Sequence, residues 1–137
     1  MKPMFKYEIK ADRGWGKTQK LVNMIYDFAV SKQLDDTVDR IIMVVTPNIK
    51  MSRNIFIRIY DTFISNSHLV EVNGLMLRFG NTFIIVNNAK VALMAFTKAD
   101  LLCVDDIELV DQEFRTFLDT LMNPDIPIIT TETVGVL

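Results

Sequence analysis

The chain has 137 residues, half of them hydrophobic, with a formal net charge of −2 and an isoelectric point near 5.3. This length can bury one substantial core but leaves no room for a second ordinary domain. The mild acidity provides no overall basic field, so a nucleic-acid partner would have to be bound by a local patch.

Cysteine and histidine usage excludes several kinds of site. The single cysteine, Cys103, excludes an internal disulfide and a cysteine-based zinc site, and the single histidine, His68, cannot form a metal cluster alone. No apolar run approaches the ~18 residues that a membrane-spanning helix needs, and the N-terminus has no signal-peptide pattern. We therefore expect one cytoplasmic domain over residues 1–137, without membrane contact.

The first segments of the chain predict a strand, a glycine-containing turn and a helix. Residues 4–10 alternate like a strand, and residues 18–29 place their apolar side chains on one helical face. The sequence A-D-R-G-W-G-K-T connects them. Unpaired N–H groups and the positive end of the helix dipole favour an anion at such a helix start.

This connection matches the phosphate-binding pattern G-x-x-x-x-G-K-[ST], except that Ala11 replaces the first glycine. In that pattern backbone N–H groups surround a phosphate, the lysine reaches the β- and γ-phosphates, and the hydroxyl ligates Mg²⁺. An ordinary loop before an amphipathic helix is the alternative. We predict binding of ATP with Mg²⁺ through the whole loop, comprising Ala11, Asp12, Gly14, Trp15, Gly16, Lys17 and Thr18.

The middle of the chain predicts a parallel sheet that carries an insertion. Residues 41–45 form the continuous apolar run of a strand buried on both faces, and residues 55–64 bury one face of a helix. Alternation of strands and helices implies right-handed crossovers. Asn-Gly and Gly-Asn pairs then predict an inserted antiparallel hairpin at about residues 69–86, whereas residues 87–98 fit either a short helix or a packed loop.

A second chemical motif is L-L-C-V-D-D, over residues 101–106, an apolar strand that ends in carboxylates. It matches the Walker B pattern, in which the strand end presents a carboxylate to Mg²⁺. We predict that Asp105 holds the metal through water and that Asp106 orients or deprotonates the attacking water. The alternative is two aspartates that only end a strand.

The last segments predict a helix up to residue 121 and an apolar strand over residues 126–131. This strand ends in hydroxyl groups. Thr130, Thr131 and Glu132 fall where a sensor of the γ-phosphate would lie between the two earlier motifs, although a plain strand end explains each of them as well.

The loop resembles the G-x-R-G-x-G-K-S loop of viral DNA-packaging ATPases, the large terminase subunits and their relatives. Arg13, Gly14, Gly16, Lys17 and Thr18 match it, and the order of the elements is similar over nearly the whole chain. The resemblance implies a P-loop NTPase of the additional-strand type, an α/β fold whose mostly parallel sheet is flanked by helices. It also places the strand at 126–131 between the P-loop strand and the Walker B strand.

For function, the resemblance implies Mg²⁺-dependent ATP hydrolysis coupled to translocation or packaging of double-stranded DNA, in a homo-oligomeric ring or with other motor subunits. We expect Arg13 to stabilise transition-state charge, in cis or as an arginine finger across a subunit boundary. The predicted roles are catalysis by Arg13, Lys17 and Asp106, metal binding by Thr18 and Asp105, and coupling by Thr130 and Thr131.

The sequence departs from that family in three ways. Asp106 replaces the usual catalytic glutamate, the chain has no room for a nuclease domain, and the upstream adenine-contacting motif is absent or supplied otherwise. The chain is thus a minimal packaging-type ATPase or a fragment of a larger one. A helicase or replication-loader ATPase is one alternative, because V-D-D-I also resembles loader motifs. A nucleotide-binding scaffold without turnover is the other.

Overall fold

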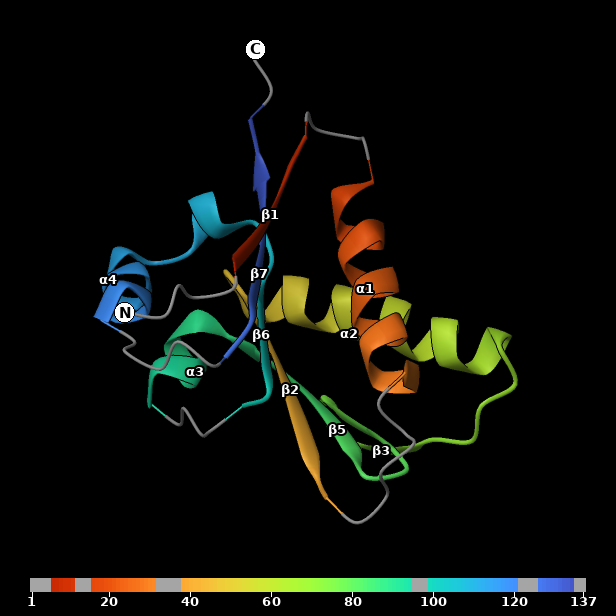
Figure 1. Ribbon diagram of the computed structural model, residues 1–137. Coiled ribbons are helices and arrows are strands. Elements are labelled where there is room, and N and C mark those ends of the chain that lie inside the picture. The colour runs from red at the N-terminus through yellow and green to blue at the C-terminus, as the bar shows by residue number, and fades with distance from the viewer. Residues whose placement is uncertain (1–5, 12–15, 32–37, 95–98, 121–125, 135–137) are drawn as a thin grey trace.

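The computed structural model describes residues 6–11, 16–31, 38–94, 99–120 and 126–134. A single sheet runs through the molecule, and helices cover both of its sides (Figure 1). The elements in chain order are β1 (Lys6–Ala11), α1 (Lys17–Ser31), β2 (Arg40–Thr46), α2 (Ile49–Ser65), β3 (Glu71–Asn73), β4 (Met76–Phe79), β5 (Thr82–Asn88), α3 (Ala89–Met94), β6 (Leu101–Val104), the 3-10 turn η1 (Ile107–Leu109), α4 (Gln112–Thr120) and β7 (Ile128–Thr133).

The sheet confirms the predicted fold class and strand order. Its seven strands follow the order β1-β7-β6-β2-β5-β4-β3. The strands β1, β7, β6, β2 and β5 are neighbours that pair in parallel. Beyond β5, the strands β4 and β3 continue the sheet with antiparallel pairing. Ile128 of β7 pairs with Lys6 on one side and with Leu102 on the other, so the last strand lies between β1 and β6, as predicted.

The antiparallel turns form at the predicted glycines, since Gly74 and Gly80 have φ angles of 61° and 59°. Such positive angles favour glycine. The strand β5, predicted as part of the insertion, has two different neighbours. It pairs antiparallel with β4 and in parallel with β2. The hairpin β3–β4 is therefore the inserted part, and β5 belongs to the parallel core.

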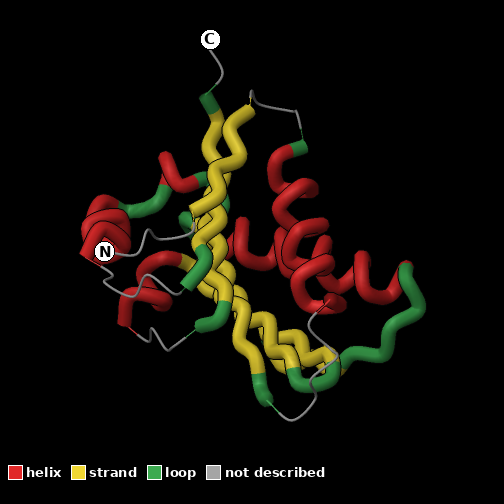
Figure 2. Tube along the Cα trace, viewed as in Figure 1, coloured by secondary structure: helices red, strands yellow, loops and turns green. Residues whose placement is uncertain are grey.

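Two hydrophobic cores cover the two faces of the sheet, as the position of the helices in Figure 2 shows. Ile42 and Val44 face α1 and α2, whereas Met43 and Val45 face α3 and α4. This explains the continuous apolar run in β2, because both faces of the strand are buried. The ambiguous segment after β5 forms the short helix α3, and residues 95–98 lie outside the described part.

The connection between β2 and α2 brings the start of α2 to the carboxyl end of the parallel sheet. Asn48 caps the helix, because its side-chain oxygen accepts a hydrogen bond of 3.0 Å from the backbone N–H of Met51. The Thr46 hydroxyl donates to the Asn48 carbonyl at 2.9 Å and lies 2.6 Å from the Ser52 hydroxyl. Within the described ranges, no helix combines the length and apolarity that crossing a bilayer requires.

Candidate active site

The predicted phosphate loop lies between the end of β1 and the start of α1, which meet at the same edge of the molecule (Figure 1). Gly16 has a φ of 72°, and its carbonyl accepts a hydrogen bond of 2.9 Å from the Lys20 N–H in the first turn of α1. A Cβ atom at Gly16 would meet nothing within 4 Å, so the backbone angle, not crowding, favours glycine there. Lys17 and Thr18 therefore stand at a helix N-terminus.

Part of the loop cannot be compared with its prediction. Asp12, Arg13, Gly14 and Trp15 lie outside the described residues. Their predicted roles in nucleotide binding, and the role of Arg13 in stabilising transition-state charge, stay predictions.

An ion pair joins the start of α1 to the residues that follow β6. The ammonium group of Lys17 bonds to a carboxylate oxygen of Asp106, which lies 89 positions further along the chain. Both side chains are buried, with about a tenth of each exposed. Buried charges of this kind need a partner, so the pair explains how Lys17 is accommodated at the helix start.

A chain of hydroxyl and carboxylate groups lies beside this pair. The Thr18 hydroxyl donates to Asp105 Oδ2 at 3.2 Å, and the Thr131 hydroxyl donates to Asp105 Oδ1 at 2.6 Å. The Thr131 oxygen also accepts a hydrogen bond of 2.8 Å from the Asp106 N–H. Thr131 therefore fixes the side chain of one aspartate and the backbone of the other.

The charge state of Asp105 is perturbed at this position. Burial raises the pKa of the Asp105 carboxyl above its usual range, and the negative charge of Asp106 acts in the same direction. The hydrogen bonds from Thr131 and Thr18 and the charge of Lys17 oppose these effects on the pKa. A buried carboxyl with a perturbed pKa beside a cleft is typical of functional sites.

The residues around Asp105 fit Mg²⁺ that arrives with a nucleotide. Carboxylate and hydroxyl oxygens are ligands that Mg²⁺ prefers, and its remaining positions are usually filled by water and phosphate oxygens. Thr18, Asp105 and Asp106 line a cleft of about 140 Å³, together with residues of α2 that include Arg58. Within the described part of the chain, no group of three or more histidine, cysteine or acidic residues is placed to hold a metal ion.

A second cleft, of about 450 Å³, also borders the ion pair. Lys17, Asp106, Glu108 and Thr133 line it, with Met51 and Leu109. Asp106 has a left-handed backbone, with φ 52° and ψ 56°. The sequence analysis did not select Glu108. This third acidic residue, two positions after the Asp-Asp pair, could have been identified as a candidate from its position in the sequence.

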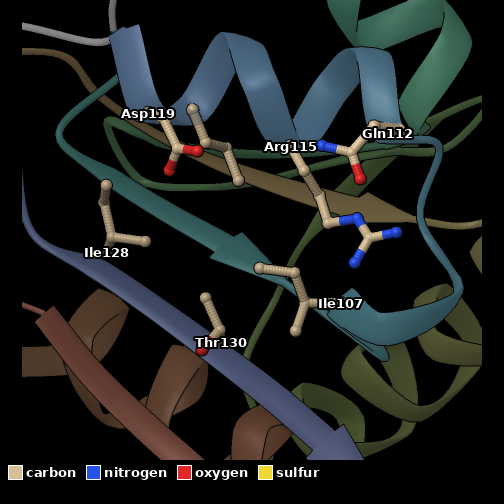
Figure 3. Close-up of a pocket in the computed structure, with 7 residues that line it drawn as sticks. Ile107, Gln112, Arg115, Asp119, Ile128 and Thr130 are labelled. Carbon is tan, nitrogen blue, oxygen red and sulfur yellow. The ribbon is translucent and has the colours of Figure 1, made fainter.

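The two predicted sensor hydroxyls lie on opposite faces of the sheet, because side chains alternate along a strand. Thr131 reaches the aspartates, whereas Thr130 lines a cavity of about 450 Å³ on the α4 side. Figure 3 shows Thr130 on β7 and Arg115 on α4 at this cavity. The structure therefore brings Lys17, Thr18, Asp105, Asp106 and Thr131 together, but not Thr130.

No protein-family model and no curated protein matches this sequence. Solved structures with a similar fold include the large terminase of bacteriophage HK97, with 11% identity over 95% of this chain and 29% of that chain, at a TM-score of 0.67. The large terminase of a thermophilic bacteriophage, solved in complex with ADP, has 11% identity over 91% of this chain and 33% of that chain, at a TM-score of 0.63.

The N-terminal domain of the DNA packaging ATPase from bacteriophage phi29 has 16% identity over 98% of this chain and 76% of that chain, at a TM-score of 0.63. The chain spans only about a third of the length of the two large terminases. At these identities the similarity concerns the fold. The chain has the fold of the ATPase domains of phage large terminases and DNA-packaging ATPases.

Proposed function

We propose that this protein hydrolyses ATP in the presence of Mg²⁺ and couples the reaction to movement of double-stranded DNA, as a packaging-motor ATPase. The observation that carries the proposal is the meeting of Lys17 and Thr18 with Asp105, Asp106 and Thr131. Asp105 and Asp106 directly follow the carboxyl end of β6, the edge where ligands bind in open parallel sheets, and Thr131 reaches them from the second half of β7.

Each side chain would have a distinct task. The start of α1 and Lys17 would bind the β- and γ-phosphates, while Thr18 and Asp105 would hold Mg²⁺, which neutralises charge on the phosphates. An arriving phosphate would compete with Asp106 for Lys17, and this competition would release the Asp106 carboxylate. Thr131 would keep both aspartates in place through the hydrogen bonds described above.

The DNA partner and the oligomeric ring are inferred from the kind of protein that shares the fold. Three exposed basic residues of α2, Lys50, Arg53 and Arg58, could contact DNA phosphates although the protein is acidic overall. Arg58 also lines the cleft beside Asp105, so the same helix would connect bound DNA with the nucleotide.

A nucleotide-binding subunit without turnover is the second candidate. The observation in its favour is that Asp106, the predicted hydrolytic residue, is paired with Lys17 and has the shorter carboxylate. Measurement of ATP turnover, with and without double-stranded DNA, separates the two functions.

The first experiment replaces Lys17 with alanine. We expect ATP binding, measured by calorimetry, to weaken below detection and turnover to fall by about 10²-fold or more, since a fixed cation at the phosphates is lost. Lys20→Ala is the matched control, because Lys20 is an exposed lysine on the same helix. Equal ATP affinity in Lys17→Ala and in the wild-type protein would contradict phosphate binding by the loop.

A further inference from the structure

Glu108 stands in the 3-10 turn that follows the two aspartates, on the wall of the cleft that Lys17 and Asp106 also line. One of its carboxylate oxygens, Oε2, accepts a hydrogen bond of 3.3 Å from the backbone N–H of Thr133. Thr133 is the last residue of β7, the strand that carries Thr131. The Glu108 carboxylate is thus attached to the same strand that positions Asp105 and Asp106.

The other oxygen of this carboxylate is buried and has no hydrogen-bond donor among the described residues. Nearly all buried acceptors in proteins have a donor, because burial removes their bonds to water. A donor from outside the described residues is therefore expected at Glu108 Oε1. Since the residue lines a cleft, a water molecule or a ligand group can supply this donor.

Asp106 is held differently, by a charged partner. Its Oδ1 atom is bonded to the Lys17 ammonium, and its backbone N–H is bonded to Thr131. A carboxylate that accepts a proton from water needs an oxygen that is free and close to the reacting phosphate. Glu108 combines one anchored oxygen with one that has no donor among the described residues, and it lies on the same cleft as the predicted phosphate-binding lysine.

We propose that Glu108 is a catalytic residue that orients the attacking water through Oε1 and accepts its proton. This inference rests on the proposed ATP hydrolysis. The water oxygen forms the new bond to the γ-phosphorus, and the bond from that phosphorus to the bridging oxygen breaks, leaving its electron pair on ADP. The proton released by the water passes to Glu108 and then to the phosphate product, which restores the carboxylate.

Glu108→Gln tests this assignment, because the amide oxygen of glutamine can still accept the bond from Thr133 while the basic carboxylate is lost. We expect kcat to fall by about 10²-fold or more, the usual size of general-base catalysis, with KM for ATP changed by less than about threefold. Glu113→Gln is the matched control, since Glu113 is an exposed glutamate in the first turn of α4; we expect it to keep the wild-type kcat.

Two further measurements separate catalysis from a structural role. ADP with aluminium fluoride mimics the phosphoryl group in transfer, so Glu108→Gln should bind this complex at least about tenfold more weakly while binding ADP alone normally. Glu108→Asp should recover part of the lost kcat. A loss of ADP affinity together with a lower melting temperature in Glu108→Gln would overturn the catalytic assignment.

The outcome also distinguishes this inference from the proposed function. If Glu108→Gln turns over ATP at the wild-type rate while Asp106→Asn does not, Asp106 is the base, and ATP hydrolysis stands without Glu108. If the wild-type protein itself shows no turnover with Mg²⁺ and double-stranded DNA, the proposed function and this inference both fail.

Discussion

The two faces of β7 differ although adjacent residues on them are equally buried. Thr131 is 0% exposed and Thr130 is 3% exposed. Thr131 bonds to both aspartates of the candidate site, whereas Thr130 lines a cavity walled by α4 and η1. Burial of a polar group therefore does not identify the site in this fold, but the charged partners around it do.

The cavity on the α4 side also has its own unsatisfied group. The Nε atom of Arg115 is buried, and it has no hydrogen-bond partner in the part of the chain that the structure describes. On the α1 side, Lys17 and Asp106 satisfy each other. The α1 face thus carries the paired charges of the candidate site, the α4 face does not, and substitutions can break or sharpen this contrast.

Replacement of each threonine by valine gives the largest expected difference between the faces, because valine keeps the shape and removes only the hydroxyl. We expect Thr131→Val to lower ATP turnover by about 10- to 100-fold, the usual cost of losing a group that orients metal ligands. Thr130→Val should stay within about threefold of the wild-type rate, as removal of a hydroxyl away from the reacting atoms costs little. The measurement is kcat at saturating Mg²⁺ and ATP.

Melting temperatures of both valine variants serve as the control for folding. A similar loss of kcat in both variants would show that the hydroxyls of the two faces contribute jointly to turnover, and the contrast between the faces would be wrong.

Asp105→Asn tests how much the buried carboxylate on the α1 face lowers the free energy of unfolding. Because the pKa of Asp105 is raised in the folded state, the unfolded chain binds fewer protons at this residue, so the carboxylate lowers the free energy of unfolding at neutral pH. As pH falls through the raised pKa, the folded protein takes up the proton and this cost disappears. Without Mg²⁺ and nucleotide, the asparagine variant should thus be more stable at neutral pH, by about 1 kcal/mol, the size of a typical single substitution.

Denaturant unfolding at several pH values measures this difference, which should shrink toward acidic pH. Addition of Mg²⁺ and ATP should reverse the order, since the wild-type protein gains more binding energy than the variant. A stability difference that does not change with pH would mean that the pKa of Asp105 is not raised in the folded protein.

The smallest effect is expected for Arg115→Met on the α4 face. Methionine keeps much of the volume and removes the unpaired Nε, so the free energy of unfolding should rise or fall by less than about 1 kcal/mol. ATP turnover should be unchanged. Thermal unfolding and steady-state kinetics measure both effects, and a tenfold loss of turnover would show that the α4 cavity influences the site.

The sequence predicted the fold well because the relevant signals are local. Apolar periodicity identified the strands and helices, and the motif resemblance placed β7 between β1 and β6, as the structure confirms. The double role of β5 could not be predicted, because an apolar strand indicates that both faces are buried but does not identify its neighbours. The apolar pattern of a strand does not show which strands form hydrogen bonds with its two edges.

The site was predictable in its residue types but not in its contacts. The pairing of Lys17 with Asp106 depends on how the fold brings together residues 89 positions apart. Alternation along β7 does imply that Thr130 and Thr131 face opposite sides, but only the packing of Ile129 against α1 assigns Thr131 to the aspartates. Glu108 depends on a 3-10 turn for its position, and the sequence pattern does not predict that turn.

The left-handed backbone at Asp106 has a consequence for the length of its acid side chain. Aspartate and asparagine adopt such angles more readily than other residues with a side chain, because they can form local hydrogen bonds. Asp106→Asn thus changes the charge and keeps the turn, whereas glutamate there would carry backbone strain of about 1 kcal/mol. The shape of the turn after β6 therefore favours the shorter acid at this position.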